Sequence, residues 1–483
     1  MLNSRGIVNS FIWVSIERIG TLGLLFVGTI ILARFLSPSE FGMIGILTIF
    51  TAISMMLVDS GMGGSLIKEK EVTKTDYSTL FIYNIVVSFI IYFLLCLSAD
   101  YIAVLYNLPQ LKEILRILAL SVVFNALSIV QRIKLTRELN FKAMSVITIV
   151  SMFVAVVISV GLAYTGFGVW ALVIQQVLQS LLNSLFFLFY VRFIPSIQFD
   201  KTSFKKHFAF GINLMGATLI NTVNVNISSS IIGKFFSLQQ TGYFTQSNKL
   251  YSMPTNIIAS IVDKAIFPIL SKRNDPKEII LVISKLSRNI YLISFPIFLM
   301  ASVLSLPMIV VVLGKEWREA SWIFSILCFG GIPLVVKTML RNVLKTLGET
   351  YCIFKCEFFS CILSLVILIF TANLSFKAMV WGIVCNNIIM MIIFMITVSK
   401  KLSYSIRLQL SNILPFLVCS IVASILLFYA ISLLPTYVQP IFVFLIGVLL
   451  GFTFILTIYI VTRNKEALSL IYRLALLVKN AVL

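Results

Sequence analysis

The sequence predicts an all-α integral membrane protein with about fourteen transmembrane helices. Three observations predict this class: a mean hydropathy of +1.04, a charged fraction of only 12%, and apolar runs that recur along the whole chain. Each run has about 18 or more residues, which is enough to cross a hydrocarbon core of roughly 30 Å. Because backbone amides in lipid must be paired within the protein, such long runs indicate helices rather than barrel strands.

The expected helices follow one another with short connections. They cover approximately residues 10–35, 40–67, 77–98, 111–133, 143–165, 168–194, 207–235, 241–271, 286–313, 319–345, 352–373, 378–399, 408–433 and 438–462. The first run contains Glu17 and Arg18 and ends without a small-residue cleavage site, so we expect a retained helix rather than a signal peptide.

Lysine and arginine are unevenly distributed across the expected membrane. Of the 38 basic residues, 27 fall on the side of the N-terminus, 7 on the opposite side, and four (Arg18, Lys249, Lys264 and Lys337) inside spans. Basic connections face the cytoplasm in membrane proteins, so we expect both termini to be cytoplasmic. The net charge of +20 then serves orientation and attraction to anionic head groups, and nucleic acid is not an expected partner.

Two segments that lie 200 residues apart share a pattern. Residues 31–43 read ILARFLSPSEFGM and residues 231–243 read IIGKFFSLQQTGY, and each closes an odd-numbered helix and opens the next. Ser37 and Ser237 are each followed three residues later by Glu or Gln, which predicts a capping box at both helix starts. The offset contains six helices, an even number, so both copies enter the membrane in the same direction as parallel repeats.

This repeat predicts the domain organisation. Residues 1–200 form an N-lobe of helices 1–6, residues 201–404 form a C-lobe of helices 7–12, and residues 405–463 form two further helices. The two lobes are expected to surround a central cavity. Residues 464–483 place apolar side chains on one helical face, which predicts an amphipathic tail on the cytoplasmic surface; the alternative is a frayed chain end.

Several motifs together resemble one family. LARFLSPSEFG at 32–42, SLIKEKEVTKTDYSTLF at 65–81 and GFGVWALVIQQ at 166–176 resemble the Wzx-type polysaccharide exporters, and in particular the WzxC branch of the polysaccharide transporter family. RELNFKA at 137–143 and FPILSK at 267–272 fit the same pattern. These motifs fall mostly at helix boundaries, so they identify a family and do not mark a substrate.

The resemblance implies a fold and a function. The family belongs to the multidrug/oligosaccharidyl-lipid/polysaccharide superfamily, whose two six-helix lobes around a cavity and two extra helices agree with the partition above. The resemblance implies a flippase, not an enzyme, in the bacterial inner membrane. By alternating access it would move undecaprenyl-diphosphate-linked oligosaccharide to the periplasmic leaflet for lipopolysaccharide, capsule or exopolysaccharide synthesis. Expected partners are that glycan lipid, membrane lipids, and the polymerase and chain-length regulator of the pathway.

Polar side chains form stripes along several expected helices, where burial in lipid costs several kcal/mol unless water or a partner relieves it. A diphosphate needs fixed cations, and sugar hydroxyls need amides that donate and accept hydrogen bonds. The alternative is helix packing through Asn, Gln and Ser, or interfacial snorkelling for the bases of the tenth helix. The expected cavity residues are Arg18, Gln175, Gln176, Gln179, Asn221, Asn224, Lys249, Asn256, Lys337 and Arg341.

Three carboxylates lie inside expected spans. Glu17, Asp59 and Asp263 are the candidates to exchange a proton or to hold a cation, which agrees with the coupling to an H⁺ or Na⁺ gradient proposed for relatives. We expect no organic cofactor, and no catalytic residues, because no nucleophile–base pairing can be placed in the sequence. We expect no metal site, because the seven cysteines lie in or beside apolar runs and the one histidine lies in a different segment. The single histidine, His207, is expected to be solvated or interfacial.

Two other functions remain open at this point. A drug/cation antiporter of the same superfamily would be expected to have an acidic and aromatic interior, whereas amides and bases prevail here. A membrane enzyme of glycan assembly would be expected to carry a large outer loop or a soluble acidic metal site, and the sequence contains no D-x-D motif.

Overall fold

The described chain consists of α-helices and the connections between them. A computed structural model describes residues 4–462 apart from 194, 197, 271–274 and 436, together with Glu466. Only the backbone is described at 4–9, 11, 213, 214, 217, 261, 263–270 and 276. No strand occurs in these residues, and the predicted all-α class is confirmed. The predicted amphipathic tail lies outside the described residues.

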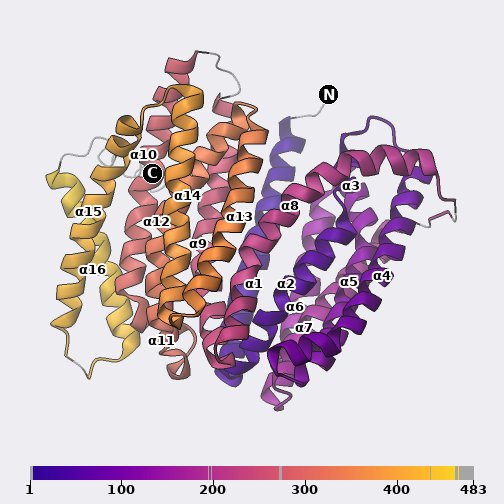
Figure 1. Cartoon of the computed structure of the whole chain (residues 1–483), viewed down its shortest axis with the longest axis horizontal. Coiled ribbons are helices and arrows are strands. Elements are labelled where there is room, and N and C mark those ends of the chain that lie inside the picture. The colour runs from indigo at the N-terminus through magenta and orange to yellow at the C-terminus, as the bar shows by residue number, and fades with distance from the viewer. Residues whose placement is uncertain are drawn as a thin grey trace. The chain divides into compact units, whose positions relative to one another are not determined.

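Fourteen helices of at least 22 residues and two shorter ones make up this part of the chain (Figure 1). They are α1 (Ser4–Phe35), α2 (Pro38–Asp59), α3 (Met62–Lys68), α4 (Lys74–Tyr106), α5 (Gln110–Arg137), α6 (Phe141–Tyr164), α7 (Val169–Val191), α8 (Lys201–Phe235), α9 (Leu238–Leu270), α10 (Pro276–Val303), α11 (Ser305–Val312), α12 (Ala320–Thr346), α13 (Thr350–Ala372), α14 (Phe376–Leu402), α15 (Ile406–Ser432) and α16 (Pro440–Val461).

Twelve segments of the described chain are long and apolar enough to cross a membrane, and the multi-pass membrane class is thereby confirmed. The two long helices that are absent from this set are α8 and α9. Both have at least 33 residues, but α8 carries Asn221, Asn224 and Asn226, and α9 carries Asn248 and Lys249. The predicted number of fourteen crossings therefore stays a prediction. These two helices, which fall outside the set of apolar segments, are the ones on which the sequence places its longest polar stripes.

The segment predicted as one helix over residues 40–67 is broken in the structure. Helix α2 ends at Asp59, and Ser60 and Gly61 follow with φ of 48° and 69° before α3 begins. Glycine adopts this left-handed region freely, whereas serine does so at a cost. A Cβ on Gly211 of α8 would lie 2.5 Å from the carbonyl oxygen of Ser60, so α8 packs closely against the break. The break leaves Asp59 at a helix end.

The first of two compact units spans Met1–Gly242, and its connections alternate between two ends. At one end, the Arg137 guanidinium donates a hydrogen bond to the carbonyl of Glu69 at 2.7 Å, which joins the end of α5 to the connection before α4. At the other end, the rings of Phe35 and Tyr164 meet edge to face, which joins the ends of α1 and α6. This alternation agrees with the predicted hairpin order. Which end faces the cytoplasm stays a prediction.

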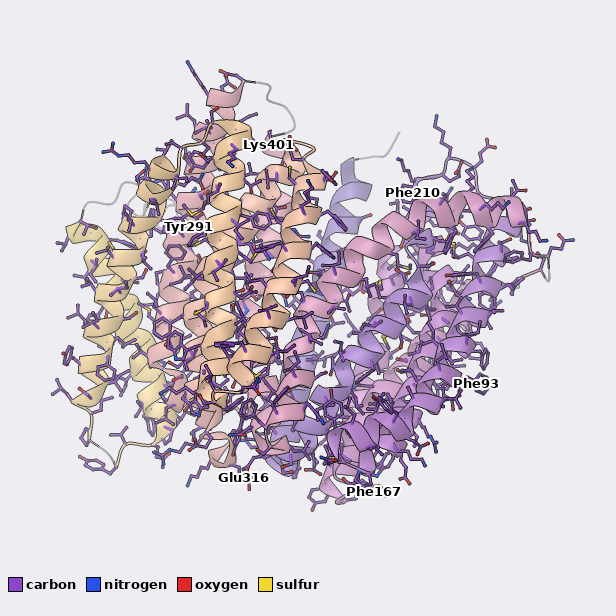
Figure 2. The ribbon with its side chains drawn as sticks, in the orientation of Figure 1. Phe93, Phe167, Phe210, Tyr291, Glu316 and Lys401 are labelled. Carbon is purple, nitrogen blue, oxygen red and sulfur yellow. The ribbon has the colours of Figure 1, made fainter. Side chains whose placement is uncertain are left out.

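Large apolar side chains cover the outside of this unit. Phe93 on α4 is 60% exposed and points away from the bundle (Figure 2). The interior is closely packed around α5, with Leu115, Leu118 and Val122 at most 1% exposed. Apolar residues on the outer surface and small or apolar ones within are the arrangement that lipid favours.

The second compact unit spans Tyr243–Leu483 and is built around α12. Trp317, just before α12, is fully buried, and the Tyr243 hydroxyl at the start of the unit donates to the carbonyl of Glu316 at 3.1 Å. The last two helices pack on the same unit, where the Tyr459 hydroxyl of α16 donates to the carbonyl of Leu292 in α10 at 3.0 Å.

The unit boundary differs from the predicted lobe boundary. The sequence assigns residues 201–235 to the C-lobe, whereas α8 belongs to the first unit by its contacts. The reason is close packing on α2: Ser230 donates to the carbonyl of Ile46 at 2.8 Å, and a Cβ on Gly233 would lie 2.3 Å from the Ile46 side chain. The lobes inferred from the repeat, with boundaries at residues 200 and 404, stay a prediction.

The two junctions of the repeat have the same local structure. Helices α1 and α8 end at Phe35 and Phe235, and α2 and α9 begin at residues 38 and 238. A capping box is present at Ser37, whose backbone N–H donates to the Glu40 carboxylate at 2.6 Å. At the second junction, the backbone N–H of Gln240 donates to the Ser237 hydroxyl, and the backbone N–H of Ser237 donates to the Gln240 side chain, both at 3.2 Å. Both predicted capping boxes are confirmed.

The two junctions also touch each other. A Cβ on Gly42 would lie 2.2 Å from the carbonyl oxygen of Leu238, and a Cβ on Gly242 would lie 1.7 Å from that of Pro38. The contact is reciprocal, because positions 38 and 238 are equivalent in the repeat, as are 42 and 242. Only glycine allows two backbones to approach this closely.

Candidate functional site

The predicted polar stripe of α9 lies in the second unit, and the structure describes its side chains as far as Asn256. Lys249 is half-buried and Asn256 is exposed. The hydroxyl of Ser252 donates to the carbonyl of Lys249 at 2.9 Å, so this serine is satisfied within the helix. The Asp263 side chain lies outside the described residues.

In the first unit, the predicted amides lie on α7 and α8. Gln175, Gln176 and Gln179 are all half-buried, as is Asn224, and Asn221 is exposed. In α7 the carbonyl oxygen of the nearby Asn183 side chain is buried without a hydrogen-bond partner in the described structure. Buried amides without partners are costly, which is more typical of a helix that meets water or ligand than of one held by packing alone.

The start of α1 places Glu17 and Arg18 differently. Glu17 is half-buried and faces α6, where the Ser145 hydroxyl lies 3.4 Å from its carboxylate. Arg18 is exposed. The two neighbours therefore do not form one site with each other.

A further cation, Arg132, interacts with two of the predicted carboxylates. Its guanidinium interacts electrostatically with both Glu17 and Asp59, and its Cζ lies 5.4 Å from the centre of the Phe187 ring. Its Nε is buried without a hydrogen-bond partner in the described structure. The sequence assigned Arg132 to a cytoplasmic connection because the helix was expected to end at residue 133. In the structure α5 continues to Arg137, which puts Arg132 five residues inside it.

The two predicted cations of α12 share a carboxylate that the sequence analysis did not single out. The Lys337 ammonium lies 3.0 Å from one oxygen of Glu357, and the Arg341 guanidinium lies 3.6 Å from the other. Lys337 and Glu357 are only 11% and 14% exposed, whereas Arg341 is 48% exposed. Glu357 is an ionisable residue within an apolar run, and this position alone could have identified it in the sequence as a candidate for an ion pair or a polar site.

Removing Lys337 should therefore destabilise the second unit. Lys337→Ala removes the buried partner of Glu357 and leaves only the exposed Arg341 at 3.6 Å; breaking a buried ion pair typically costs about 3–5 kcal/mol. We expect a clearly lower melting temperature of the purified protein, and we expect Lys337→Met combined with Glu357→Leu to recover most of it. Lys355→Ala on the exposed face of α13, where the lysine lies over the Tyr351 ring, is the control. Equal melting temperatures for Lys337→Ala and Lys355→Ala would refute the assignment.

The motif at 65–81 holds one end of the first unit together. His207 is 5% exposed, not solvated as expected, because its Nδ1 lies 2.9 Å from the Ser65 hydroxyl and its Nε2 lies 3.9 Å from the Asp76 carboxylate. Lys206, at 2.8 Å from Glu69, lowers the pKa of that exposed carboxyl below its usual value. The motif residues are thus mainly structural.

The fold that these helices form is that of a multi-pass membrane transporter. The chain matches a structure titled lipid II flippase MurJ, inward closed conformation, with a TM-score of 0.74 and 14% identity over 94% of this chain and 99% of that one. It also matches an inward-facing multidrug resistance MATE family transporter with a TM-score of 0.64 and 13% identity, over 82% and 98% of the two chains.

Sequence comparison is more specific. Residues 31–322, more than half of the chain, match the family described as polysaccharide biosynthesis protein, and the chain belongs to that family. It is 24% identical to the succinoglycan biosynthesis transport protein ExoT of Rhizobium meliloti (strain 1021) and to the lipopolysaccharide biosynthesis protein WzxC of Escherichia coli (strain K12), in each case over 72% of this chain and 71% of the relative. It is 29% identical to the teichuronic acid biosynthesis protein TuaB of Bacillus subtilis (strain 168), over 62% of each chain. The resemblance to the Wzx-type exporters is confirmed.

Proposed function

We propose that this protein is a flippase that moves undecaprenyl-diphosphate-linked oligosaccharide from the cytoplasmic to the periplasmic leaflet of a bacterial inner membrane. The family match over residues 31–322 carries the proposal. The names of the relatives, which place them in the synthesis or transport of surface polysaccharides, support it, and so does the likeness to the fold of a lipid II flippase. The substrate joins the synthesis of a surface polysaccharide, and the polymerase and chain-length regulator of that synthesis are the proposed protein partners.

The substrate has two parts that the protein must recognise. The diphosphate requires cations, for which we propose Arg18, Lys249, Lys337 and Arg341, of which the last two also share Glu357. The glycan requires amides, which Gln175, Gln176, Gln179, Asn221, Asn224 and Asn256 supply. The polyprenyl chain remains in lipid and needs no polar site.

Transport against a gradient requires a coupled step. We propose that Glu17 and Asp59, with Arg132 beside both, exchange a proton or a sodium ion as the protein alternates between inward- and outward-open states. Arg132 interacts electrostatically with both carboxylates and would be released from one when that one is neutralised. Asp263 is the third candidate. In this proposal the protein needs no organic cofactor, and both termini face the cytoplasm.

The test is transport by the purified protein in liposomes. Undecaprenyl-diphosphate-linked oligosaccharide is placed in the membrane, and a glycosidase outside reports the fraction that becomes accessible under an imposed H⁺ or Na⁺ gradient. We expect the fraction of glycan lipid that the glycosidase can cleave to rise in liposomes that contain the protein and not in liposomes without it. The likeness to a MATE transporter makes a drug/cation antiporter the second candidate. Uptake of a cationic dye without movement of the glycan lipid would favour that antiporter and overturn the proposal.

A further inference from the structure

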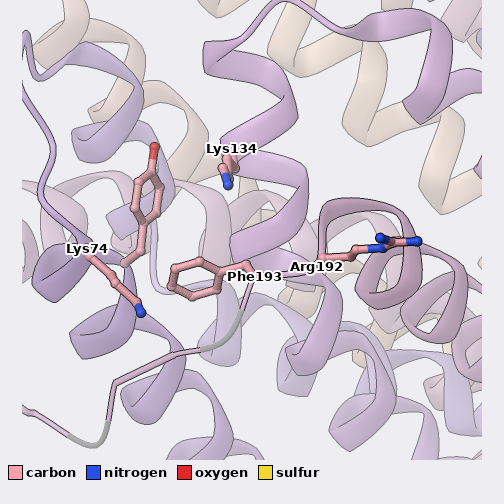
Figure 3. Close-up of a pocket in the computed structure, with 5 residues that line it drawn as sticks. Lys74, Lys134, Arg192 and Phe193 are labelled. Atoms are coloured by element: carbon pink, nitrogen blue, oxygen red, sulfur yellow. The ribbon is translucent and has the colours of Figure 1, made fainter.

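A basic pocket lies at one end of the first unit, among residues that the transport proposal does not use. It has a volume of about 430 Å³ and is lined by Lys74, Tyr77, Lys134, Arg192 and Phe193 (Figure 3). The three cations come from three helices. Lys74 begins α4, Lys134 lies in the last turn of α5, and Arg192 caps the C-terminus of α7. All three helix ends belong to the side that the charge distribution assigns to the cytoplasm.

The cations of the pocket have no counter-ion among the residues that the structure describes. Within the described residues, Lys74, Lys134 and Arg192 form no ion pair, unlike Lys206 on the same end of the unit, which pairs with Glu69. The nearby carboxylate of Asp76 does not pair with these cations. It accepts hydrogen bonds from the Thr73 backbone N–H at 2.8 Å and from the Ser203 hydroxyl at 2.6 Å. Glu138 interacts electrostatically with Tyr77 but is paired with none of the three cations.

Two aromatic rings form a fixed wall of the pocket. Phe193 packs edge to face on Tyr77 with ring centres 5.9 Å apart, and the Lys134 ammonium lies 5.9 Å from the centre of the Phe193 ring. Figure 3 shows the ammonium of Lys134 directed toward Phe193, whereas the Arg192 side chain extends in the opposite direction from the Phe193 ring. The two lysines thus lie on the side of the aromatic wall, and Arg192 lies at the edge of the pocket.

Arg192, the C-cap residue of α7, has a strained backbone conformation. Arg192 has φ of 49°, in the left-handed region where glycine or asparagine would be accommodated at lower cost. A non-glycine residue in this conformation is a feature that recurs at functional sites. The conformation turns the chain directly after α7 and sets Phe193 against Tyr77.

From these observations we infer that the pocket binds a phosphate group at the cytoplasmic surface, independently of the transport site. Lys74 and Lys134 donate charge-assisted hydrogen bonds to the phosphate oxygens, Arg192 adds positive charge at the edge of the pocket, and Tyr77 and Phe193 contact the group that the phosphate carries. The volume suits a small head group or a free phosphate ester rather than a lipid tail. Both a lipid head group and a soluble phosphate offer this chemistry.

Two binding measurements on the purified full chain distinguish these sources. Inorganic pyrophosphate is titrated by calorimetry, and retention of phosphatidylglycerol against phosphatidylcholine is measured by native mass spectrometry. Binding of at least one anionic probe should weaken about tenfold or more in Lys74→Gln/Lys134→Gln, as expected for lost charge-assisted bonds. Arg192→Asn should also weaken it, with an unchanged or higher melting temperature, because asparagine relieves the strained turn. If only pyrophosphate binding weakens, the ligand is a soluble phosphate; if only phosphatidylglycerol retention weakens, the ligand is a lipid head group.

A matched control makes the inference falsifiable. Lys142→Gln removes a lysine that also lies over an aromatic ring, that of Trp13, at the same end of the unit but outside the pocket. This control should not weaken the measured binding. If neither probe binds the wild type, if the pocket variants bind as tightly as the wild type, or if the control weakens binding as strongly, the pocket is not a phosphate site. The transport proposal is unaffected by that result.

Discussion

Replacing Gly242 with alanine should prevent the protein from accumulating in a folded form. The new Cβ would lie 1.7 Å from the carbonyl oxygen of Pro38 and 2.5 Å from its carbonyl carbon, and both are backbone atoms that cannot rotate away. Overpacking of a protein interior typically costs about 1–3 kcal/mol, and a clash between two helix starts should reach or exceed the upper end of that range. Gly42→Ala, with 2.2 Å to the Leu238 carbonyl oxygen, should have the same effect.

The measurement is the amount of monodisperse protein extracted from membranes, together with its melting temperature. Gly161→Ala in α6 is the matched control, because a Cβ there meets nothing within 4 Å. Alanine favours the helix over glycine by about 1 kcal/mol, so this variant should be as stable as the wild type or more so. If Gly242→Ala is as stable as Gly161→Ala, the close approach of the two junctions is not present in the protein.

The reciprocal contact has a meaning beyond stability. Residues of one repeat junction touch the equivalent residues of the other in both directions, which is how surfaces related by a two-fold axis meet. The contact is therefore what a two-fold repeat would produce, and the parallel direction inferred from the sequence stays a prediction. A double variant, Gly42→Ala/Gly242→Ala, should be no more stable than either single one, because both clashes occur at one contact.

Lys249→Ala should abolish or nearly abolish export of the lipid-linked glycan while the protein remains in the membrane at its normal level. A charge-assisted hydrogen bond to phosphate is worth about 1.5–3 kcal/mol. Its loss corresponds to a tenfold to hundredfold weaker interaction at 1.4 kcal/mol per decade. The same liposome assay of glycan accessibility measures the effect. Lys249 is half-buried on the most polar face of α9, so its removal should disturb the fold little.

Asn256→Ala, two helical turns further along the same helix, is the control for Lys249→Ala. It removes an uncharged and exposed side chain, so it should reduce export much less. Export by Lys249→Ala at the wild-type rate would mean that the polar stripe of α9 serves packing, and the assignment of the transport site would fail. Equal losses in both variants would likewise argue against a specific phosphate contact by the lysine.

The sequence by itself determined the features that depend on local chemistry. Apolar runs predicted an all-helical membrane protein because lipid demands that every backbone amide be paired within the chain. The pair of serines at positions 37 and 237 predicted two capping boxes, since a cap needs only residues three positions apart. The family resemblance rested on such local motifs, and comparison with known proteins bears it out.

The tertiary structure alone decided which distant residues meet. Local patterns did not indicate that Arg132 interacts with Glu17 and Asp59. Helix α5 ends four residues later than the sequence predicts, and this difference places Arg132 deeper within the helix. The pairing of Lys337 with Glu357 depends on how α12 packs on α13. Even the reciprocal glycine contact, whose sequence positions were visible in the repeat, required the packing of helices that lie far apart in the chain. Helix formation is set by neighbours along the chain, whereas burial and ion pairing are set by neighbours in space, and only the fold determines those.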